Sequence, residues 1–125
     1  MKEFVRTISH RNKKLHDHEG CDVDMEYLLD LWHVQRGRCA YTNEEMHASD
    51  RVGRGRHPSA VSVDRIDSDL PYARGNVVLC TWWANMAKQT LTVAEFRQRC
   101  RNVATVANVV PVILEYVSRP ETWKP

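Results

Sequence analysis

Residues 60–88 constrain the fold of this chain most strongly, because two short strand patterns there lead directly into a helical one. The run "AVSVD" (residues 60–64) alternates as a short strand does, and "NVVLC" (residues 76–80) forms a second strand pattern. Residues 65–75 lie between them and end in a turn at Gly75-Asn76. The stretch "TWWANMAKQTL" that follows favours a helix. We therefore expect an irregular hairpin that feeds a helix.

Helical patterns also occupy much of the remaining sequence. Residues 1–18 have sparse apolar positions in a basic background, which predicts a surface helix or arm. A second helix is expected after Asp24, a suitable N-cap, and Gly37 provides its stop. Pro111 can begin a final helix that runs to Ser118.

Two further helical segments follow the hairpin. In the first, the spacing of Trp83, Met86 and Ala87 predicts the face that packs. In the second, Thr92 and Glu95 form a capping box. The expected order is α-α-ββ-α-α-α, a mainly helical α+β fold in a single domain.

Composition places the chain among ordinary globular proteins. With 125 residues, 42% of them hydrophobic and 27% charged, the chain is long enough for one core. No apolar run approaches the roughly 20 residues that span a bilayer. The first 20 residues are too polar for a signal-peptide core. We expect a cytoplasmic protein with no membrane partner.

The four cysteines do not form a recognisable zinc motif. None of them belongs to a C-x-x-C pair, so a structural zinc site would have to recruit them singly, together with histidines. Reduced thiols are the favoured interpretation, with three of the four packed as small buried hydrophobes, and structural zinc is not expected. The four are Cys21, Cys39, Cys80 and Cys100.

The net charge of +2 says little about partners, but the charge is unevenly distributed. The run "RVGRGRH" contributes Arg51, Arg54 and Arg56, and no acidic residue lies between Asp50 and Asp64. Arginine presents a planar fork that suits bidentate contact with phosphate. This loop therefore favours contact with a nucleic-acid backbone, and a solvated loop that aids solubility is the alternative.

Three polar residues stand where the strands and helix of the central segment meet. Asp64 ends the first strand, Asn76 opens the second, and Asn85 lies one turn into the helix. Carboxylate and amide oxygens are hard donors that suit Mg²⁺ or Mn²⁺ rather than Zn²⁺. One such ion can polarise a phosphodiester. Lys88, on the same helix face as Asn85, is placed to reach a phosphate.

The pattern "SVDRID…Y..GNVVL…N..K", preceded by "LWHVQRGRCAYTNEEM", resembles the HNH or ββα-metal endonucleases. The likeness is greatest to small phage and bacterial members with a D-R-I-D first motif, and it covers about residues 29–91. It implies that Asp64 binds the metal and that Asn76 braces the turn and orients the catalytic residue. It places Asn85 at the third motif position, which completes the metal site.

The sequence departs from this family at two places. Many members have a catalytic histidine directly after the metal aspartate, where this chain has Arg65, and arginine does not ordinarily serve as a base. In one interpretation Arg65 holds the scissile phosphate and another group is the base: His57 first, then Asp67, His47 or a hydroxide on the metal. Many members also carry two C-x-x-C zinc pairs, of which only Cys39 and Cys80 resemble remnants.

The resemblance thus implies a DNA endonuclease dependent on one Mg²⁺ or Mn²⁺ ion, which nicks one strand per site. Its core would span residues 29–91, between a basic arm (1–22) and C-terminal helices (92–125). The residues assigned to catalysis are His57, Arg65, Asn76 and Lys88, with Asp64 and Asn85 on the metal and Arg51, Arg54, Arg56, Arg65 and Lys88 on nucleic acid.

The sequence alone leaves alternatives to this activity open. The alternative interpretations are a slow nickase, or an inactive site in a module that only binds nucleic acid. A small zinc-binding interaction domain that uses Cys39, Cys80 and nearby histidines is a third hypothesis. Whether the protein is a monomer or a homodimer is left open.

Overall fold

The computed structural model describes residues 2–48, 51–52 and 55–105. The chain has an α+β fold and divides into two compact units, Met1–Val93 and Ala94–Pro125. Helix α4 (Val93–Thr105) makes up most of the described part of the second unit. The helix expected at Pro111–Ser118 lies outside the described residues. Within the described part of the chain, no helix is both long and apolar enough to cross a membrane.

The first unit is built on an antiparallel pair of strands, β3 (Val61–Arg65) and β4 (Val77–Thr81). Val63 lies opposite Leu79 and Asp64 opposite Val78 in the register of the pair. The predicted hairpin is confirmed, and each strand begins and ends one residue later than expected. Almost every residue of both strands is buried, so the pair is covered on both faces.

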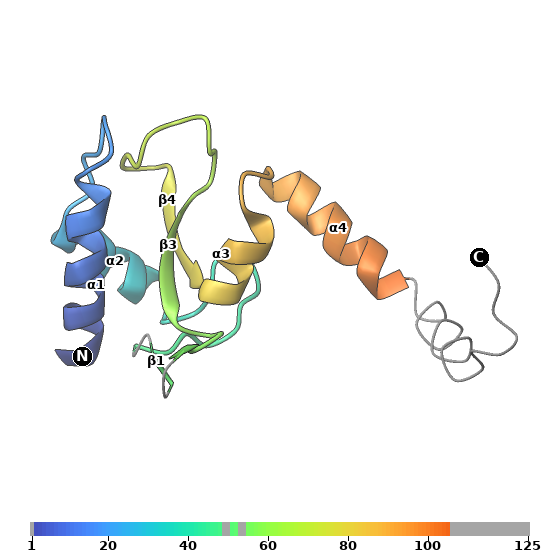
Figure 1. The fold of residues 1–125 in the computed structure, drawn as a ribbon, viewed down its shortest axis with the longest axis horizontal. Helices are drawn as coiled ribbons and strands as arrows, with labels where there is room; N and C mark the ends of the chain where they lie inside the picture. The colour runs from blue at the N-terminus through green and yellow to red at the C-terminus, as the bar shows by residue number, and fades with distance from the viewer. Residues whose placement is uncertain (1, 49–50, 53–54, 106–125) are drawn as a thin grey trace, which may run out of the picture. The chain divides into compact units, whose positions relative to one another are not determined.

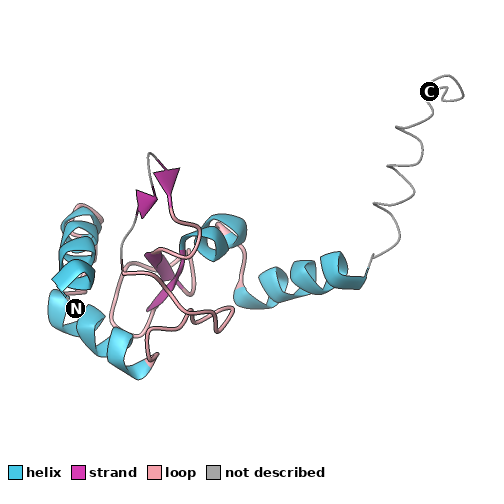
Figure 2. Cartoon of the chain, turned by 90° about the horizontal axis from the view of Figure 1, so that it is seen from below, coloured by secondary structure: helices cyan, strands magenta, loops and turns pink. Residues whose placement is uncertain are grey.

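Helices provide that cover. Helices α1 (Lys2–Leu15) and α2 (Met25–Val34) lie on one side of the strand pair, and α3 (Trp82–Lys88) lies on the other, as Figures 1 and 2 show. Helix α1 contacts β3, α2 contacts β4, and α3 contacts both strands. The hairpin is thus the middle layer of three.

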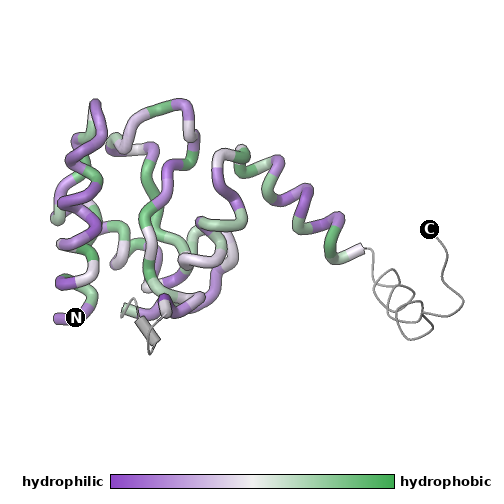
Figure 3. Tube along the Cα trace, viewed as in Figure 1, coloured by the Kyte–Doolittle hydropathy of each residue, from purple (hydrophilic) through white to green (hydrophobic). Residues whose placement is uncertain are grey.

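Apolar side chains from all three layers form one core. Figure 3 shows hydrophobic residues concentrated along β3 and β4, whereas α1 is largely hydrophilic outside a few positions. Those positions include Phe4 and Ile8, which are 1% and 0% exposed. The rings of Phe4 and Trp32 lie 4.2 Å apart between centroids. The core therefore fixes the helices against the strands that carry the polar residues.

Helix α2 begins and ends as the sequence predicts. The carboxylate of Asp24 accepts a hydrogen bond of 2.9 Å from the Tyr27 N–H, which caps the helix. Beyond the helix, Gly37 has a φ of 67° and donates its N–H to the Trp32 carbonyl over 3.0 Å. A Cβ at this position would lie 3.1 Å from the Trp32 side chain, so both backbone conformation and space favour glycine.

The side chain of Gln35 joins α2 to β4. Its Nε2 donates to the Leu79 carbonyl over 2.8 Å, and its Oε1 accepts from the Leu79 N–H over 3.0 Å. The amide thus pairs with the strand edge as another strand would. The Ala40 N–H also donates to the Leu79 carbonyl, and this contact brings the segment before Tyr41 alongside β4.

The expected loop over residues 48–59 is wrong in part, because it contains a second strand pair. Strands β1 (Arg51–Val52) and β2 (Gly55–Arg56) are antiparallel, with Arg51 opposite Arg56. Before this pair, His47 donates its N–H to the Ser59 carbonyl and accepts from the Val61 N–H. The insertion is therefore attached to the start of β3 at both of its ends.

Helix α3 follows β4 without a linker. The Thr81 hydroxyl caps it by accepting a hydrogen bond of 3.3 Å from the Ala84 N–H. The expected packing face is wrong: Trp83 and Met86 are 37% and 53% exposed, whereas Ala84 and Lys88 are both 0% exposed. Because α3 begins directly after β4, the strand sets the rotation of the helix and turns Ala84 and Lys88 toward the hairpin.

Candidate functional site

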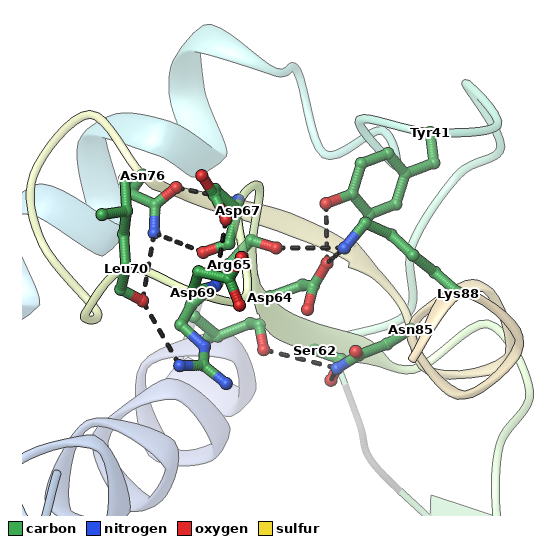
Figure 4. A network of polar contacts seen from close by, with 11 residues as sticks. Tyr41, Ser62, Asp64, Arg65, Asp67, Asp69, Leu70, Asn76, Asn85 and Lys88 are labelled. Atoms are coloured by element: carbon green, nitrogen blue, oxygen red, sulfur yellow. Dashed lines mark hydrogen bonds and ion pairs between the residues drawn. The ribbon is translucent and has the colours of Figure 1, made fainter. Parts of the chain in front are cut away.

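The centre of the candidate site is the carboxylate of Asp64, near the end of β3. The residue is only 7% exposed. Its Oδ2 accepts a hydrogen bond of 2.7 Å from the Tyr41 hydroxyl and lies 3.0 Å from the Nζ of Lys88 (Figure 4). Among the described residues, Oδ1 accepts no hydrogen bond, so one carboxylate oxygen is held and the other is available to a further partner.

Lys88 is a buried cation at the end of α3. The residue is 0% exposed, and its Nζ donates to the Arg65 carbonyl over 3.1 Å in addition to pairing with Asp64. The Nζ also lies 5.6 Å from the centre of the Tyr41 ring. A charge this deeply buried requires such partners, because desolvation of a single ion is costly. We expected Lys88 to reach a phosphate, but in the structure its ammonium is turned inward, toward Asp64.

Asn85 lies one turn before Lys88, and its side chain is fixed by two acceptors on β3. Its Nδ2 donates to the Ser62 hydroxyl over 2.8 Å and to the Val63 carbonyl over 3.3 Å. Because a carbonyl can only accept, the nitrogen of the amide must face β3. The Oδ1 of Asn85 therefore points away from these two groups, and no described residue donates to it.

The residue spacing within β3 and within α3 brings these side chains together in two pairs. Ser62 and Asp64 lie on the same face of β3, since side chains of a strand alternate. Asn85 and Lys88 lie three residues apart and share one face of α3. Asn85 contacts Ser62, and Lys88 contacts Asp64. The Oδ1 atoms of Asp64 and Asn85 are therefore presented by neighbouring positions of two packed elements.

This donor set fits a small divalent cation better than zinc. A carboxylate and an amide oxygen, each without a donor to Oδ1 from the described residues, are hard ligands of the kind Mg²⁺ and Mn²⁺ prefer, with water completing the shell. In the described part of the chain, no three or more His, Cys, Asp or Glu side chains gather as a metal-binding group. Any ion held here would thus have few protein ligands.

Asn76 holds the loop between the two strands of the hairpin. Its Oδ1 accepts from the Asp67 N–H over 2.9 Å, while its Nδ2 donates to the carbonyls of Asp67 and Pro71 over 3.0 and 2.9 Å. A longer contact of 3.5 Å reaches the Leu70 carbonyl. Asn76 is 9% exposed. One buried amide therefore fixes both sides of a loop that has no regular secondary structure.

Gly75, directly before Asn76, makes this arrangement possible. It has a φ of 90°, a conformation that L residues with side chains rarely adopt. Its N–H donates to the hydroxyl of Tyr27 over 2.9 Å. An added Cβ would meet nothing within 4 Å, so the backbone conformation rather than space requires glycine here.

Arg65 follows the central carboxylate and is held by the same loop. Its Nη1 donates to the Leu70 carbonyl over 3.3 Å, and its guanidinium lies 4.9 Å from the centre of the Tyr72 ring. The residue is half-buried and forms no ion pair with any described carboxylate. The Arg65 guanidinium therefore has no carboxylate counterion among the described residues.

His57 is placed away from the central carboxylate. Its backbone carbonyl accepts from the Ala60 N–H, just before β3, whereas Asp64 lies near the other end of the strand. With a rise of about 3.3 Å per residue, the Cα atoms of Ala60 and Asp64 are roughly 13 Å apart. The backbones of His57 and Asp64 therefore lie near opposite ends of β3.

The ring of His57 is also committed to another contact. Its Nδ1 accepts a hydrogen bond of 3.0 Å from the Ser59 N–H, and the ring lies 3.7 Å from that of His47 between centroids. A backbone N–H can only donate, so the neutral ring carries its proton on Nε2. To accept a proton, His57 would have to give up the hydrogen bond to Ser59.

Only part of the predicted nucleic-acid surface falls on described side chains. Arg54 lies outside the described residues, and Arg51 is described as part of β1 alone. Arg56 is half-buried, and its guanidinium lies 5.7 Å from the centre of the Trp82 ring. This contact leaves the cation of Arg56 next to the start of α3.

Tyr41 is the residue of the site that the sequence interpretation missed. Burial, followed by the hydrogen bond to Asp64, raises the pKa of Tyr41 well above its usual range. The hydroxyl therefore stays protonated and donates to Asp64 throughout the neutral range. The one sequence signal is its place within "CAYT", two residues after Cys39, which marks the segment but not its contact with Asp64.

The two buried cysteines differ in their surroundings. Burial acts to raise the pKa of Cys39, but hydrogen bonds from the Thr42 side chain and from backbone N–H groups, that of Thr81 included, lower it below its usual value. The Thr81 N–H lies 3.3 Å from Sγ. Burial, and then the negative charge of Asp64, raise the pKa of the Cys80 thiol. Both thiols are free, and the Cys39 Sγ accepts hydrogen bonds from the Thr81 N–H and hydroxyl.

Comparisons of the chain with protein-family models, with curated proteins and with solved structures found no match.

Proposed function

We propose that this protein is a metal-dependent HNH endonuclease that hydrolyses DNA phosphodiester bonds, nicking one strand at each site. The observation that carries the proposal is the pair of oxygens on β3 and α3: the Oδ1 atoms of Asp64 and Asn85, both without a donor among the described residues. They stand in the order that the sequence resemblance implies, on a hairpin followed directly by a helix.

Three side chains have complementary roles in this proposal. Asp64 and Asn85 would hold one Mg²⁺ or Mn²⁺ ion, which polarises the phosphodiester and stabilises the leaving oxygen when bound. Arg65, which has a free charge and a fixed position, would bind the scissile phosphate and the negative charge that develops on it. Asn76 would position Arg65 through the loop that both contact.

The proton of the attacking water must go to a group other than Arg65 or His57. Arg65 cannot lose its proton near neutral pH, and His57 uses its lone pair to accept from Ser59. Asp67 is exposed, but its Oδ1 accepts from the Asp69 N–H over 2.9 Å. Solvent or a phosphate oxygen of the substrate can take the proton instead, at the expense of rate. We therefore propose a slow nuclease.

Relaxation of supercoiled plasmid tests this function directly. The protein should convert plasmid to the nicked form with Mg²⁺ or Mn²⁺ and not with EDTA. Asp64→Ala should abolish nicking, and Asp30→Ala, which removes an exposed carboxylate of α2, should not change it. Nicking that persists in Asp64→Ala would rule out the assignment of this site.

A nucleic-acid-binding module without catalysis is the second candidate function. The observation that favours it is the ion pair of Asp64 with Lys88, because the buried carboxylate already has a counterion within the chain. A gel-shift assay on the same DNA distinguishes the two functions. Binding that is retained in Asp64→Ala, with no metal-dependent nicking by the parent protein, would support the module.

A further inference from the structure

The Asp64 carboxylate is already neutralised within the protein, and this has a consequence for the metal site on which the proposed function depends. Lys88 is 0% exposed and lies 3.0 Å from Oδ2, whereas Oδ1 faces away from it (Figure 4). One buried negative charge and one buried positive charge thus form a pair. The pair needs no metal ion to remain buried without a net charge.

A divalent ion at Oδ1 would share this carboxylate with Lys88. Two cations on one carboxylate repel each other, and the repulsion is stronger in a partly desolvated site than in water. The ammonium therefore lowers the affinity of the site for metal. When the metal is absent, the ammonium also provides the buried carboxylate with a counterion.

Tyr41 acts on the same oxygen in a different way. Its hydroxyl donates to Oδ2 over 2.7 Å and carries no charge, and its ring lies against the Lys88 ammonium. Two donors on Oδ2 fix the rotation of the carboxylate and leave Oδ1 as the oxygen without a donor among the described residues. Lys88 also holds the Arg65 carbonyl, so the backbone beside the carboxylate is fixed with it.

We propose that Lys88 is the resident counterion of Asp64, which keeps the site assembled without metal and limits its affinity for metal, and that Tyr41 is a positioning residue for the same carboxylate. The proposal rests on the proposed function in that it concerns the same metal site. It explains why a lysine is buried where a phosphate-binding residue was expected. Neither residue needs to touch DNA.

Binding of Mn²⁺, followed by the electron paramagnetic resonance signal of the free ion, tests the counterion role without any nuclease assay. Lys88→Met removes the charge and keeps an unbranched apolar side chain. We expect this variant to bind Mn²⁺ at least about tenfold more tightly than the parent, a change of about 1.4 kcal/mol. Damage to the fold alone would weaken binding, so tighter binding is specific to the counterion role.

Thermal unfolding of the same variants gives the second measurement. Without metal, Lys88→Met should melt at a lower temperature than the parent protein, because Asp64 has lost its counterion. Saturating Mn²⁺ should raise its melting temperature more than it raises that of the parent. Lys14→Met, which removes an exposed charge of α1, is the matched control and should change neither quantity.

A second variant keeps the test decisive if Lys88→Met does not fold in EDTA. Lys88→Gln retains a donor for the Arg65 carbonyl but has no charge. If both variants are unfolded without metal, Mn²⁺ should restore their folded state at concentrations that saturate the parent. Failure of Mn²⁺ to refold them, or equal or weaker binding of Mn²⁺ by a folded Lys88 variant, would overturn the counterion role.

The positioning role of Tyr41 has its own measurement. Tyr41→Phe keeps the ring beside Lys88 and removes only the donor to Oδ2. Nicking by this variant should show a lower kcat with an unchanged KM for DNA, and Mn²⁺ binding within about threefold of the parent. Tyr27→Phe, which loses a hydroxyl hydrogen bond to Gly75, is the control for loss of stability alone. An equal fall in kcat in both variants would contradict the role.

The outcomes separate this inference from the proposed function. A parent protein that binds Mn²⁺ and nicks DNA, with Lys88 variants that bind no more tightly, would refute the counterion role alone. Tighter Mn²⁺ binding by Lys88→Met in a protein that never nicks DNA would support it and refute the nuclease. A parent protein that binds no Mn²⁺, with Lys88→Met equally inert, would refute both.

Discussion

Asn76 and Arg65 meet at a single carbonyl, that of Leu70, which accepts from the Arg65 guanidinium over 3.3 Å and from the Asn76 amide over 3.5 Å. The two residues lie at opposite ends of the loop that joins β3 to β4. The Asn76 amide forms three further hydrogen bonds to that loop, two that it donates and one that it accepts from the Asp67 N–H. The position of the Arg65 side chain therefore depends on Asn76, although no contact joins the two directly.

The first prediction concerns this dependence. Asn76→Ala removes a buried side chain and leaves several backbone groups of the loop without this partner, which should lower the free energy of unfolding by about 2 kcal/mol. Because Arg65 is then no longer held in place, nicking should fall by about 100-fold. Urea unfolding and plasmid relaxation measure the two effects. Asn102→Ala, which removes an exposed asparagine of α4, should reproduce neither effect.

The second prediction separates the charge of Arg65 from its shape. Arg65→Ala should lower kcat for nicking by about 100-fold, as expected when a group that stabilises a developing negative charge is lost. Arg65→Lys keeps the charge but not the planar fork, and should recover only part of the rate. Arg97→Ala, on an exposed position of α4, is the matched control. Full activity of Arg65→Ala would remove Arg65 from the mechanism.

Arg65→His should give the nicking rate a pH dependence that the parent protein lacks. Arg65→His places an imidazole where many of the nucleases that the sequence resembles have their base. Its nicking rate should rise with pH around 6.5, the ordinary pKa of histidine, and the parent rate should show no such step. Rates from about pH 5.5 to 8.5 at constant Mg²⁺ and ionic strength measure this. An identical profile for both proteins would indicate that the side chain at position 65 does not reach the attacking water.

The third prediction concerns His57, the first candidate for the base. Since its Nδ1 accepts from Ser59 and its backbone lies near the opposite end of β3 from Asp64, His57→Ala should leave the shape of the pH–rate profile unchanged. A modest loss of DNA affinity is compatible with its place beside the arginine-rich strands. His33→Ala, exposed on α2, is the control. If His57→Ala lost the fall in nicking rate at acidic pH and His33→Ala kept it, His57 would again be the candidate base.

The sequence predicts local structure here better than it predicts which side chains are buried. The hairpin, the cap at Asp24 and the stop at Gly37 depend on a few adjacent residues, and each is confirmed. The packing face of α3 depends on how the helix leaves β4, which periodicity alone does not record. Trp83 and Met86 were therefore expected inside, where the structure has Ala84 and Lys88.

In the candidate site, too, features set by local spacing were predictable, whereas those set by distant contacts were not. Asp64 and Asn85 are placed together by strand alternation and helical spacing, both of which can be read from the sequence. The burial of Lys88 and the donor at Tyr41 depend on contacts between residues 23 or more positions apart, which no local pattern contains. The chemistry of the oxygens was thus predictable, whereas the groups that control Asp64 were not.

The last prediction uses the raised pKa of Tyr41. Burial and the hydrogen bond to Asp64 hold the folded-state pKa well above the ordinary value of 10.0, so the protonated hydroxyl contributes stability that is fully present below pH 10. Above that pH the unfolded chain loses the proton and the folded chain keeps it. The stability that the hydroxyl provides therefore falls as pH rises, by up to about 1.4 kcal/mol per pH unit.

Urea unfolding of the parent and of Tyr41→Phe between pH 8 and 11 measures this contribution as a difference, because other titrating groups are common to both proteins. The advantage of the parent over Tyr41→Phe should be constant up to about pH 9.5 and then shrink. An advantage that stays constant to pH 11 would mean that the Tyr41 hydroxyl is not shielded from solvent. In that case its hydrogen bond to Asp64 would not fix the carboxylate, and the orientation of Oδ1 would need another cause.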